Sequence, residues 1–92
     1  MLPATNDLKV MELLVTGPMY GGEMVERGGL KRGSIYTVLE RLVRKKLVMT
    51  WQGRTNQVGI RGTLRLYYSL TPHGERTLRA AKAAQKILDE DD

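Results

Sequence analysis

Residues 31–70 read KRGSIYTVLERLVRKKLVMTWQGRTNQVGIRGTLRLYYSL, and this stretch decides the fold. Its first half predicts an amphipathic helix, because apolar side chains recur at the i, i+3, i+4, i+7 and i+8 positions of one buried stripe. These side chains are Ile35, Val38, Leu39, Leu42 and Val43. The second half predicts two strands, residues 47–52 and 64–70. The polar loop between them, residues 53–63, is too long for a tight hairpin turn.

Three further helices are predicted on either side of this stretch. The first begins at a cap in residues 5–7 and runs to about Val15, before the breaker Gly17-Pro18. The second covers about residues 20–27 and stops at a pair of glycines. The last covers about residues 72–88, with Thr71 as its N-cap and proline at its first helical position.

Positive charge is concentrated on the central stretch. Residues 27–65 contain ten lysines and arginines and one acidic residue, Glu40, although the formal net charge of the whole chain is only +5. A basic patch on one helix and one hairpin is typical of a protein that binds nucleic acid. There is no cysteine, and no apolar run approaches the length of a membrane span. We therefore expect a cytoplasmic, nucleoid-associated protein with no membrane partner.

The predicted order is helix, helix, helix, strand, strand, helix, which is α+β and mainly α. A helix-turn-helix followed by a two-stranded wing is a winged helix-turn-helix, a fold that places its recognition helix in the major groove of duplex DNA. We expect a DNA-binding domain over residues 1–71 and a dimerisation helix over residues 72–92. The acidic residues 89–92 are expected to be disordered, because carboxylates at a helix C-terminus oppose its dipole.

The polar side of the central helix supplies the first set of predicted DNA contacts. At about 100° per residue, Gly33, Thr37, Arg41 and Arg44 lie opposite the apolar stripe. Threonine and serine can bond base edges, and Arg41 or Arg32 can fork onto a guanine. Backbone N–H groups at the helix start favour a phosphate. The predicted contacts here are Lys31, Arg32, Gly33, Ser34, Tyr36, Thr37, Arg41 and Arg44.

The wing supplies the second set, Arg54, Thr55, Arg61 and Arg65. An arginine on a projecting loop can enter a minor groove, where the potential is most negative in A·T tracts, and threonines can contact phosphates. Val58 and Ile60 near the tip either fold back on Trp51 or meet a second protein, and the sequence leaves both open.

Several motifs resemble the PadR family of winged-helix transcriptional regulators. They are L-L…G-P-M-Y-G over residues 13–21, G-S-I-Y and L-E-R-L within residues 33–42, and Y-Y-S-L-T-P-H-G over residues 67–74. The resemblance implies a DNA contact from Tyr36. For the whole chain we expect a sequence-specific, dimeric DNA-binding regulator, a repressor that competes with polymerase for a promoter. Gly22 departs from the pattern, because the family usually has an aromatic residue there.

The resemblance also implies dimerisation through the last helix with the first helix alongside. Small and apolar side chains on the two helices carry this expectation, namely Leu8, Met11, Leu78, Ala81 and Leu88. Some family members bind flat aromatic drugs in a dimer pore lined by a tryptophan of the C-terminal helix. Here Trp51 is on a wing strand and no aromatic residue follows Tyr68, so no such pore is implied and any effector stays unspecified.

Neither catalysis nor a cofactor or metal is predicted. His73 is the only histidine, and the chain has no phosphate-binding glycine loop. Two alternatives to a regulator of duplex DNA stay open. A DNA-organising or plasmid and chromosome segregation protein would coat repeated sites, and a protein-interaction winged helix would bind its partner through Trp51, Val58 and Ile60.

Overall fold

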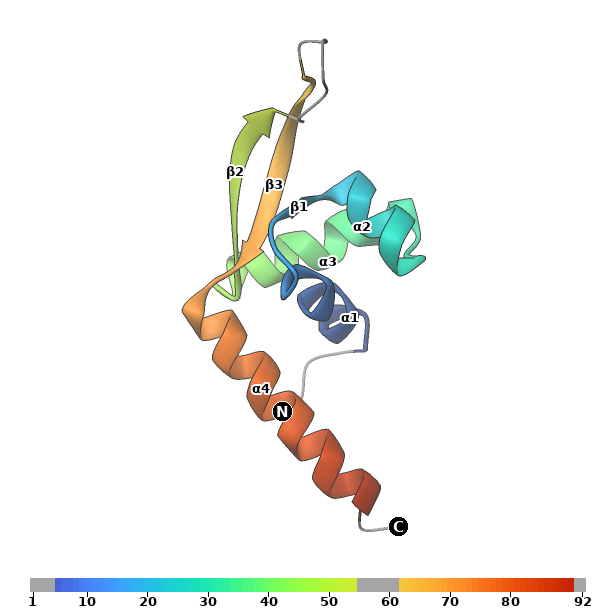
Figure 1. Cartoon of the computed structure of the whole chain (residues 1–92), viewed down its shortest axis with the longest axis vertical. Helices are drawn as coiled ribbons and strands as arrows, with labels where there is room; N and C mark the ends of the chain where they lie inside the picture. The colour runs from blue at the N-terminus through green and yellow to red at the C-terminus, as the bar shows by residue number, and fades with distance from the viewer. Residues whose placement is uncertain (1–4, 55–61, 91–92) are drawn as a thin grey trace.

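The computed structural model describes residues 5–54 and 62–90 (Figure 1). Its elements, in chain order, are α1 (Thr5–Leu14), β1 (Met19–Tyr20), α2 (Gly21–Gly28), α3 (Arg32–Arg44), β2 (Val48–Arg54), β3 (Leu64–Leu70) and α4 (Pro72–Glu90). The predicted fold class and the order of helices and long strands are confirmed. The strand β1 was not predicted, because two residues are too few for an alternating pattern.

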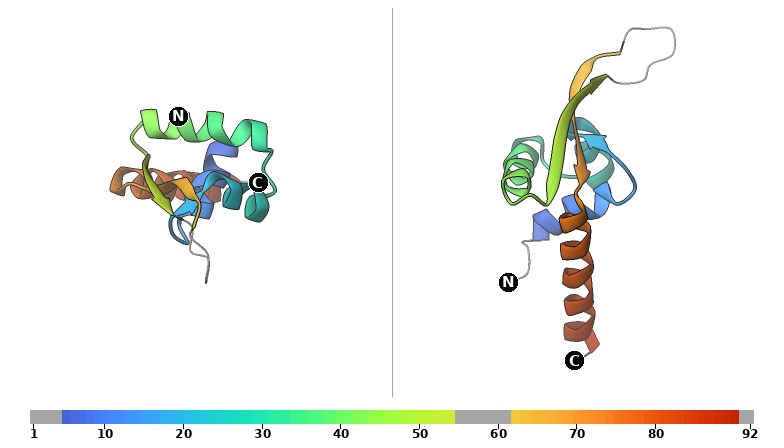
Figure 2. Two further views of the ribbon diagram at one scale, coloured as in Figure 1. Left: turned by 90° about the horizontal axis from the view of Figure 1, so that it is seen from above. Right: turned by 90° about the vertical axis from the view of Figure 1, so that its left-hand side faces the viewer.

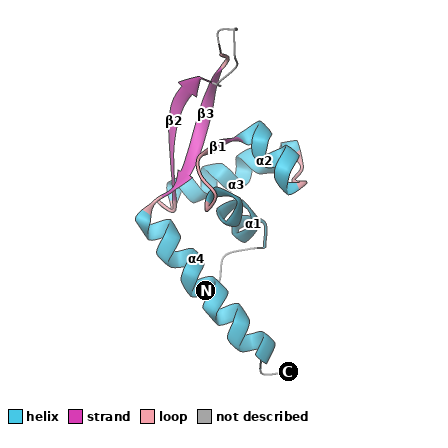
Figure 3. Ribbon diagram, in the orientation of Figure 1, coloured by secondary structure: helices cyan, strands magenta, loops and turns pink. Residues whose placement is uncertain are grey.

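The three strands form one antiparallel sheet in the order β1–β3–β2 (Figure 3). β2 and β3 pair along their whole length, with Val48 opposite Leu70 at the base of the hairpin. β1 pairs with the middle of β3, where Tyr20 lies opposite Tyr67. The two-stranded wing is therefore the β2–β3 hairpin, and a short third strand joins its inner half.

The helices α1, α2 and α3 enclose one hydrophobic core with the base of the sheet. The apolar stripe of α3 lies in this core as predicted, with Val43 only partly buried. The buried members of the cluster are Val10, Met11, Leu14, Met19, Met24, Ile35, Val38, Leu39, Leu42, Leu47, Val48, Tyr68, Leu70 and Leu78. Each large apolar side chain buried here contributes about 1.5–3 kcal/mol, so the core fixes which side of α3 faces outward.

The start of α1 differs from the prediction. The helix begins at Thr5, so Asp7 lies inside its first turn instead of capping it. Asp7 is only 1% exposed, and its carboxylate is paired with Arg41 of α3. The end of α1 at Leu14 agrees with the prediction within one residue, and Gly17 follows it with a φ of 139°, a backbone conformation that favours glycine.

The junction between the sheet and α4 is closely packed. Thr71 caps α4 as predicted, because its Oγ1 accepts a hydrogen bond from the Gly74 N–H at 2.9 Å and donates one to the Lys46 carbonyl at 2.7 Å. A Cβ atom on Gly74 would lie 2.0 Å from the Leu47 carbonyl oxygen. The first turn of α4 therefore lies directly against the turn between α3 and β2.

Beyond this junction α4 extends away from the body (Figure 1). Leu78 and Ala81 are buried, and no residue after Ala81 with a described side chain is buried. The helix continues to Glu90, two residues past the predicted end, so the expectation of a disordered acidic end is wrong for Asp89 and Glu90. Residues 91–92 lie outside the described part of the chain.

Candidate nucleic-acid interface

Helix α3 lies along one side of the molecule, and the hairpin and α4 extend from the body in opposite directions (Figure 2). The molecule is elongated as a result, with extents of 54 × 24 × 22 Å.

The outward side of α3 is polar, as the wheel predicted. Gly33, Thr37 and Arg44 are exposed on it, and the exposed carboxylate of Glu40 lies between the last two. The flanks differ from each other. Ser34 lies on the α1 side, where it lines a small hollow with Val10, and the half-exposed Tyr36 lies on the sheet side.

The start of α3 offers backbone donors to an anion. Lys31 is the N-cap residue with extended backbone angles, and its side chain makes no capping hydrogen bond. Its carbonyl accepts hydrogen bonds from the N–H groups of Ser34 and Ile35, at 3.0 and 3.1 Å. The earlier N–H groups have no partner within the helix. The exposed side chains of Lys31 and Arg32 add positive charge at the same end.

Arg41 occupies a different environment from the other arginines of α3. Its Nε donates to Oδ2 of Asp7 at 3.1 Å, and its Nη2 donates to Oδ1 of the same carboxylate. The hydrogen bond to Asp7, and next the negative charge of that carboxylate, raise the pKa of Arg41 above its ordinary value. The fork expected to point at a guanine therefore points at α1. Sequence analysis missed Asp7, because no local pattern links residues that are 34 positions apart.

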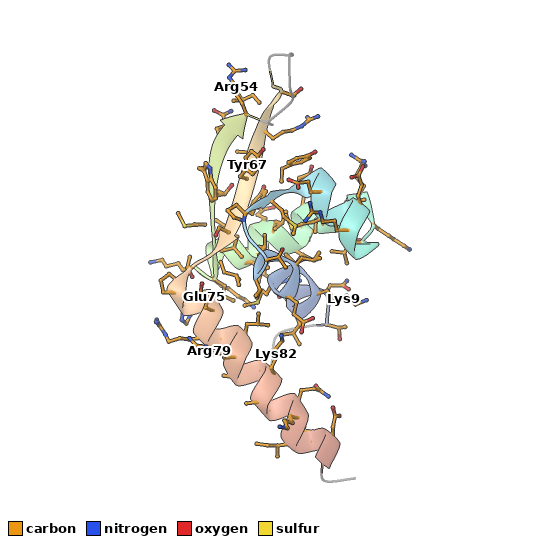
Figure 4. All side chains as sticks on the ribbon, in the orientation of Figure 1. Lys9, Arg54, Tyr67, Glu75, Arg79 and Lys82 are labelled. Atoms are coloured by element: carbon orange, nitrogen blue, oxygen red, sulfur yellow. The ribbon has the colours of Figure 1, made fainter. Side chains whose placement is uncertain are left out.

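The wing arginines with described positions project near the far half of the hairpin. Figure 4 shows Arg54 at the far end of β2 and Tyr67 midway along β3. Arg54 donates from Nη1 to the Gly62 carbonyl at 3.2 Å, and the Arg65 guanidinium lies 5.9 Å from the centre of the Tyr20 ring. The predicted contacts Thr55 and Arg61, and the tip residues Val58 and Ile60, lie outside the described residues.

A groove of about 400 Å³ separates the start of α3 from the wing. It is lined by Tyr20, Gly21, Gly22, Glu26, Arg32, Tyr36, Leu64, Arg65 and Leu66. Tyr36 is held there by close contact with α2, since a Cβ atom on Gly21 would lie 2.8 Å from its hydroxyl oxygen. The Tyr20 ring is similarly close to Gly22, at 3.0 Å. This ring accounts for the space beside Gly22, the position where the family usually has an aromatic residue.

Three aromatic rings form a row across the sheet, which the sequence did not predict. Trp51 and Tyr67 are stacked with ring centroids 6.1 Å apart, and Tyr20 meets Tyr67 edge-on at 5.8 Å. These residues share one face, because Trp51 and Tyr20 both lie opposite Tyr67 in the strand register. The Tyr67 hydroxyl also donates to the Arg54 carbonyl at 3.4 Å. The row stiffens the hairpin that carries the wing arginines.

The five residues expected at a dimer contact differ in their exposure in the single chain. Met11, Leu78 and Ala81 are buried within the single chain, so the expectation that they face a second copy needs correction. They are inward-facing because the first half of α4 covers α1. Leu8 packs partly buried against the same core. Leu88 is 56% exposed, and its neighbour Ile87 is 59% exposed.

The described residues give no sign of a metal centre. His73 is exposed in the first turn of α4, and no group of three or more His, Cys, Asp or Glu residues within 5–54 and 62–90 is placed to hold a metal ion. In the same part of the chain, no helix combines the length and the apolar character needed to cross a membrane.

The fold and the exposed basic helix define a winged helix-turn-helix protein. The model of the PadR-like family of transcriptional regulators matches residues 10–80. The chain therefore belongs to this family and is a DNA-binding transcription regulator, not an enzyme.

Solved structures agree with this assignment. A PadR family transcription regulator from Clostridium difficile is 27% identical, with a TM-score of 0.77 over 95% of this chain and 93% of that one. A PadR-like regulator from Bacillus cereus is 21% identical, with a TM-score of 0.76 over 94% and 85% of the two chains. Bacillus subtilis PadR, solved in complex with operator DNA, is 19% identical with a TM-score of 0.69, over 83% of this chain and 45% of that one. At the two lower identities the likeness shows the fold alone. No curated protein matches the chain.

Proposed function

We propose that this protein is a sequence-specific, dimeric repressor that inserts α3 into the major groove and lays its basic wing on the adjacent backbone or minor groove. One observation carries the proposal. The apolar side of α3 is buried in the core, and its polar side is exposed next to a hairpin that bears exposed arginines. The relative from Bacillus subtilis, with its operator complex, supports DNA as the partner.

The two surfaces have different roles in this proposal. The first turns of a recognition helix read base edges, so Ser34 and Thr37 are assigned to bases, with Tyr36 at the edge of the groove. Arg44, in the last turn of α3, is assigned to a phosphate. Wing residues contact the sugar–phosphate backbone and set the register without reading sequence. Arg54 and Arg65 are assigned to this task, together with the tip residues Thr55 and Arg61.

Dimerisation is assigned to the far half of α4. Residues 82–89 of this helix are not buried in the single chain, although Ile87 and Leu88 are large and apolar. A groove of about 450 Å³ between α4 and the end of α1, lined in part by Leu14 and Val15, offers an apolar seat for the same helix of a second copy. An isologous contact there would present two recognition helices to successive major grooves, roughly 34 Å apart.

DNA binding is tested by its salt dependence. A dimer that neutralises six to ten phosphates should lose roughly 10³–10⁵-fold in affinity between 50 and 200 mM salt. Fluorescence anisotropy with a duplex selected from a random library measures this, and flat salt dependence would exclude the proposal. A footprint over one palindrome supports a regulator, whereas an extended array of protection supports a DNA-coating protein. Repression is tested by transcription in vitro from a promoter that contains the selected site.

The dimer is tested by ending the chain after Gln85. This truncation removes Ile87 and Leu88 but keeps Leu78 and Ala81 in the core, so the body should stay folded. Sedimentation equilibrium should then show monomers, and the truncated chain should bind a half-site and a full palindrome with similar affinity. An unchanged dimer would instead place the interface elsewhere.

A further inference from the structure

Asp7 of α1 and Arg41 of α3 form an ion pair in which the carboxylate is buried and the arginine is partly exposed. The carboxylate of Asp7 is almost wholly buried, and about a third of the Arg41 side chain is exposed. Both carboxylate oxygens accept from Arg41, one from Nε at 3.1 Å and the other from Nη2. This bidentate geometry uses the whole Nε/Nη2 edge of the guanidinium, one of the two edges that can fork onto a phosphate or a guanine.

The pair resists opening. If Arg41 moved to a DNA phosphate, Asp7 would be left as a buried carboxylate without a counter-charge, which is strongly unfavourable. No buried side-chain nitrogen or oxygen in the described residues lacks a partner in the present arrangement. The exposed Arg44, one turn further along α3, has no ion pair among the described residues and is free to turn toward a duplex.

We propose that Asp7 is a positioning residue that withholds Arg41 from DNA and so limits the sequence-independent part of the affinity. This inference rests on the proposed DNA-binding function and assigns a role to a residue outside the helix and the wing. Arg41 is the tenth residue of α3, past the first turns that read bases, and its guanidinium lies on the flank toward α1. An arginine already neutralised at contact distance adds little to the release of counterions from DNA.

The experiment measures the affinity of the full-length chain for two duplexes at 50–200 mM salt. One duplex is selected from a random library with the wild-type chain, and the other is a scrambled duplex of the same composition. Asp7→Asn should free the guanidinium, steepen the salt slope by about one unit per chain, and strengthen binding to both duplexes roughly eightfold per chain at 0.1 M salt. Glu12→Gln is the matched control. It removes a carboxylate of α1 whose partner is Lys82, at 3.8 Å, and should leave the slope unchanged.

A double variant keeps the test decisive if Asp7→Asn does not fold. Asp7→Asn/Arg41→Gln replaces the ion pair by two amides that can bond each other, so thermal unfolding should stay cooperative. Since Arg41 contributes no DNA contact in the wild-type chain, this variant should match the wild-type slope and the wild-type ratio of affinities for the two duplexes. Arg44→Ala should flatten the slope by about one unit per chain, because an exposed arginine that contacts a phosphate is lost.

Three results would overturn the inference. A slope flattened by about one unit per chain in the double variant would show that Arg41 contacts phosphate in the wild-type chain. A narrowed affinity ratio in that variant would show that Arg41 reads a base. An unchanged slope in a folded Asp7→Asn chain would show that the released arginine does not reach DNA. Each result appears in a chain that still binds duplex DNA. The proposed function fails separately, if the wild-type chain shows no salt-dependent binding.

Discussion

The base of the sheet differs from the two projecting ends of the molecule, the wing and the far half of α4, in how far apolar side chains are buried. At the base, Leu39 and Leu42 are fully buried among side chains of α1, α3 and the sheet. At the ends, Leu66 of the wing and Leu88 of α4 are each more than half exposed. The base therefore carries the stability of the single chain, and the ends have apolar surface available for DNA or a second copy. Substitutions that act on only one region test this division.

The largest effect is expected at the base. Leu39→Ala deletes a side chain with no exposed surface, so the lost transfer free energy and the cavity should lower the free energy of unfolding by about 2–5 kcal/mol. Leu66→Ala removes the same atoms from a side chain that is 51% exposed, and it should change the free energy of unfolding by less than about 0.5 kcal/mol. Urea denaturation of the two variants measures both values. Equal losses would contradict the division between base and ends.

The next effect concerns the close contact at the start of α4. Gly74→Ala would place a Cβ atom 2.0 Å from the Leu47 carbonyl oxygen, so the first turn of α4 must move away. We expect a loss of about 3 kcal/mol, the upper part of the usual range for overpacking. In a domain of this size that corresponds to a melting temperature roughly 12–24 °C lower.

Gly33→Ala is the control for the glycine substitution. No atom lies within 4 Å of a Cβ atom built at Gly33, and the position is helical. Alanine there should raise stability by up to about 1 kcal/mol. A Gly74→Ala chain as stable as the wild type would show that the junction yields without cost.

The elements predicted correctly from the sequence are those specified by neighbouring residues. The stripe of α3 repeats within nine residues, and Thr71 with Pro72 marks a helix start by local hydrogen bonding and fixed φ. Contacts between residues that are far apart in the sequence leave no such local pattern. Tyr20 joins the sheet 47 positions away from its partner Tyr67 (67 − 20), and Asp7 reaches Arg41 across the core. The helical wheel placed Arg41 among the outward-facing residues, but its side chain is only partly exposed and lies on the flank toward α1, because periodicity carries no information about its partner.

For the candidate site too, the sequence predicted the features that depend on neighbouring residues and missed those that depend on how the helices pack. The exposure of Thr37 and Arg44 follows from the periodicity of their own helix. The burial of Met11, Leu78 and Ala81 depends on how α4 crosses α1, which periodicity does not specify. Each of the three was expected at a contact with a second copy, and each is instead buried within the single chain.

A third prediction separates the two DNA-contacting surfaces. Thr37→Ala should weaken binding to the selected duplex by about 1–3 kcal/mol and leave binding to a scrambled duplex nearly unchanged, because a base contact is lost. Arg65→Ala should weaken both and flatten the salt slope by about one unit, because a phosphate contact is lost. Anisotropy titrations at several salt concentrations give both quantities. If the two variants behave alike, the division between a base-reading helix and a backbone-holding wing is wrong.

The smallest effect on stability is expected in the wing, where the row formed by Trp51, Tyr67 and Tyr20 supplies the aromatic packing. Trp51 is 38% exposed and stacks on Tyr67, and a leucine in its place keeps part of the apolar contact but loses the stacking of the two rings. Trp51→Leu should lower the free energy of unfolding by about 0.5–1.5 kcal/mol, the usual contribution of an aromatic pair. Met49, on the same strand, is 51% exposed and has no stacked ring. Met49→Leu should therefore change the free energy of unfolding by less than about 0.5 kcal/mol. Chemical denaturation distinguishes the two, and equal values would mean that the stacked rings stabilise the wing no more than any exposed apolar side chain does.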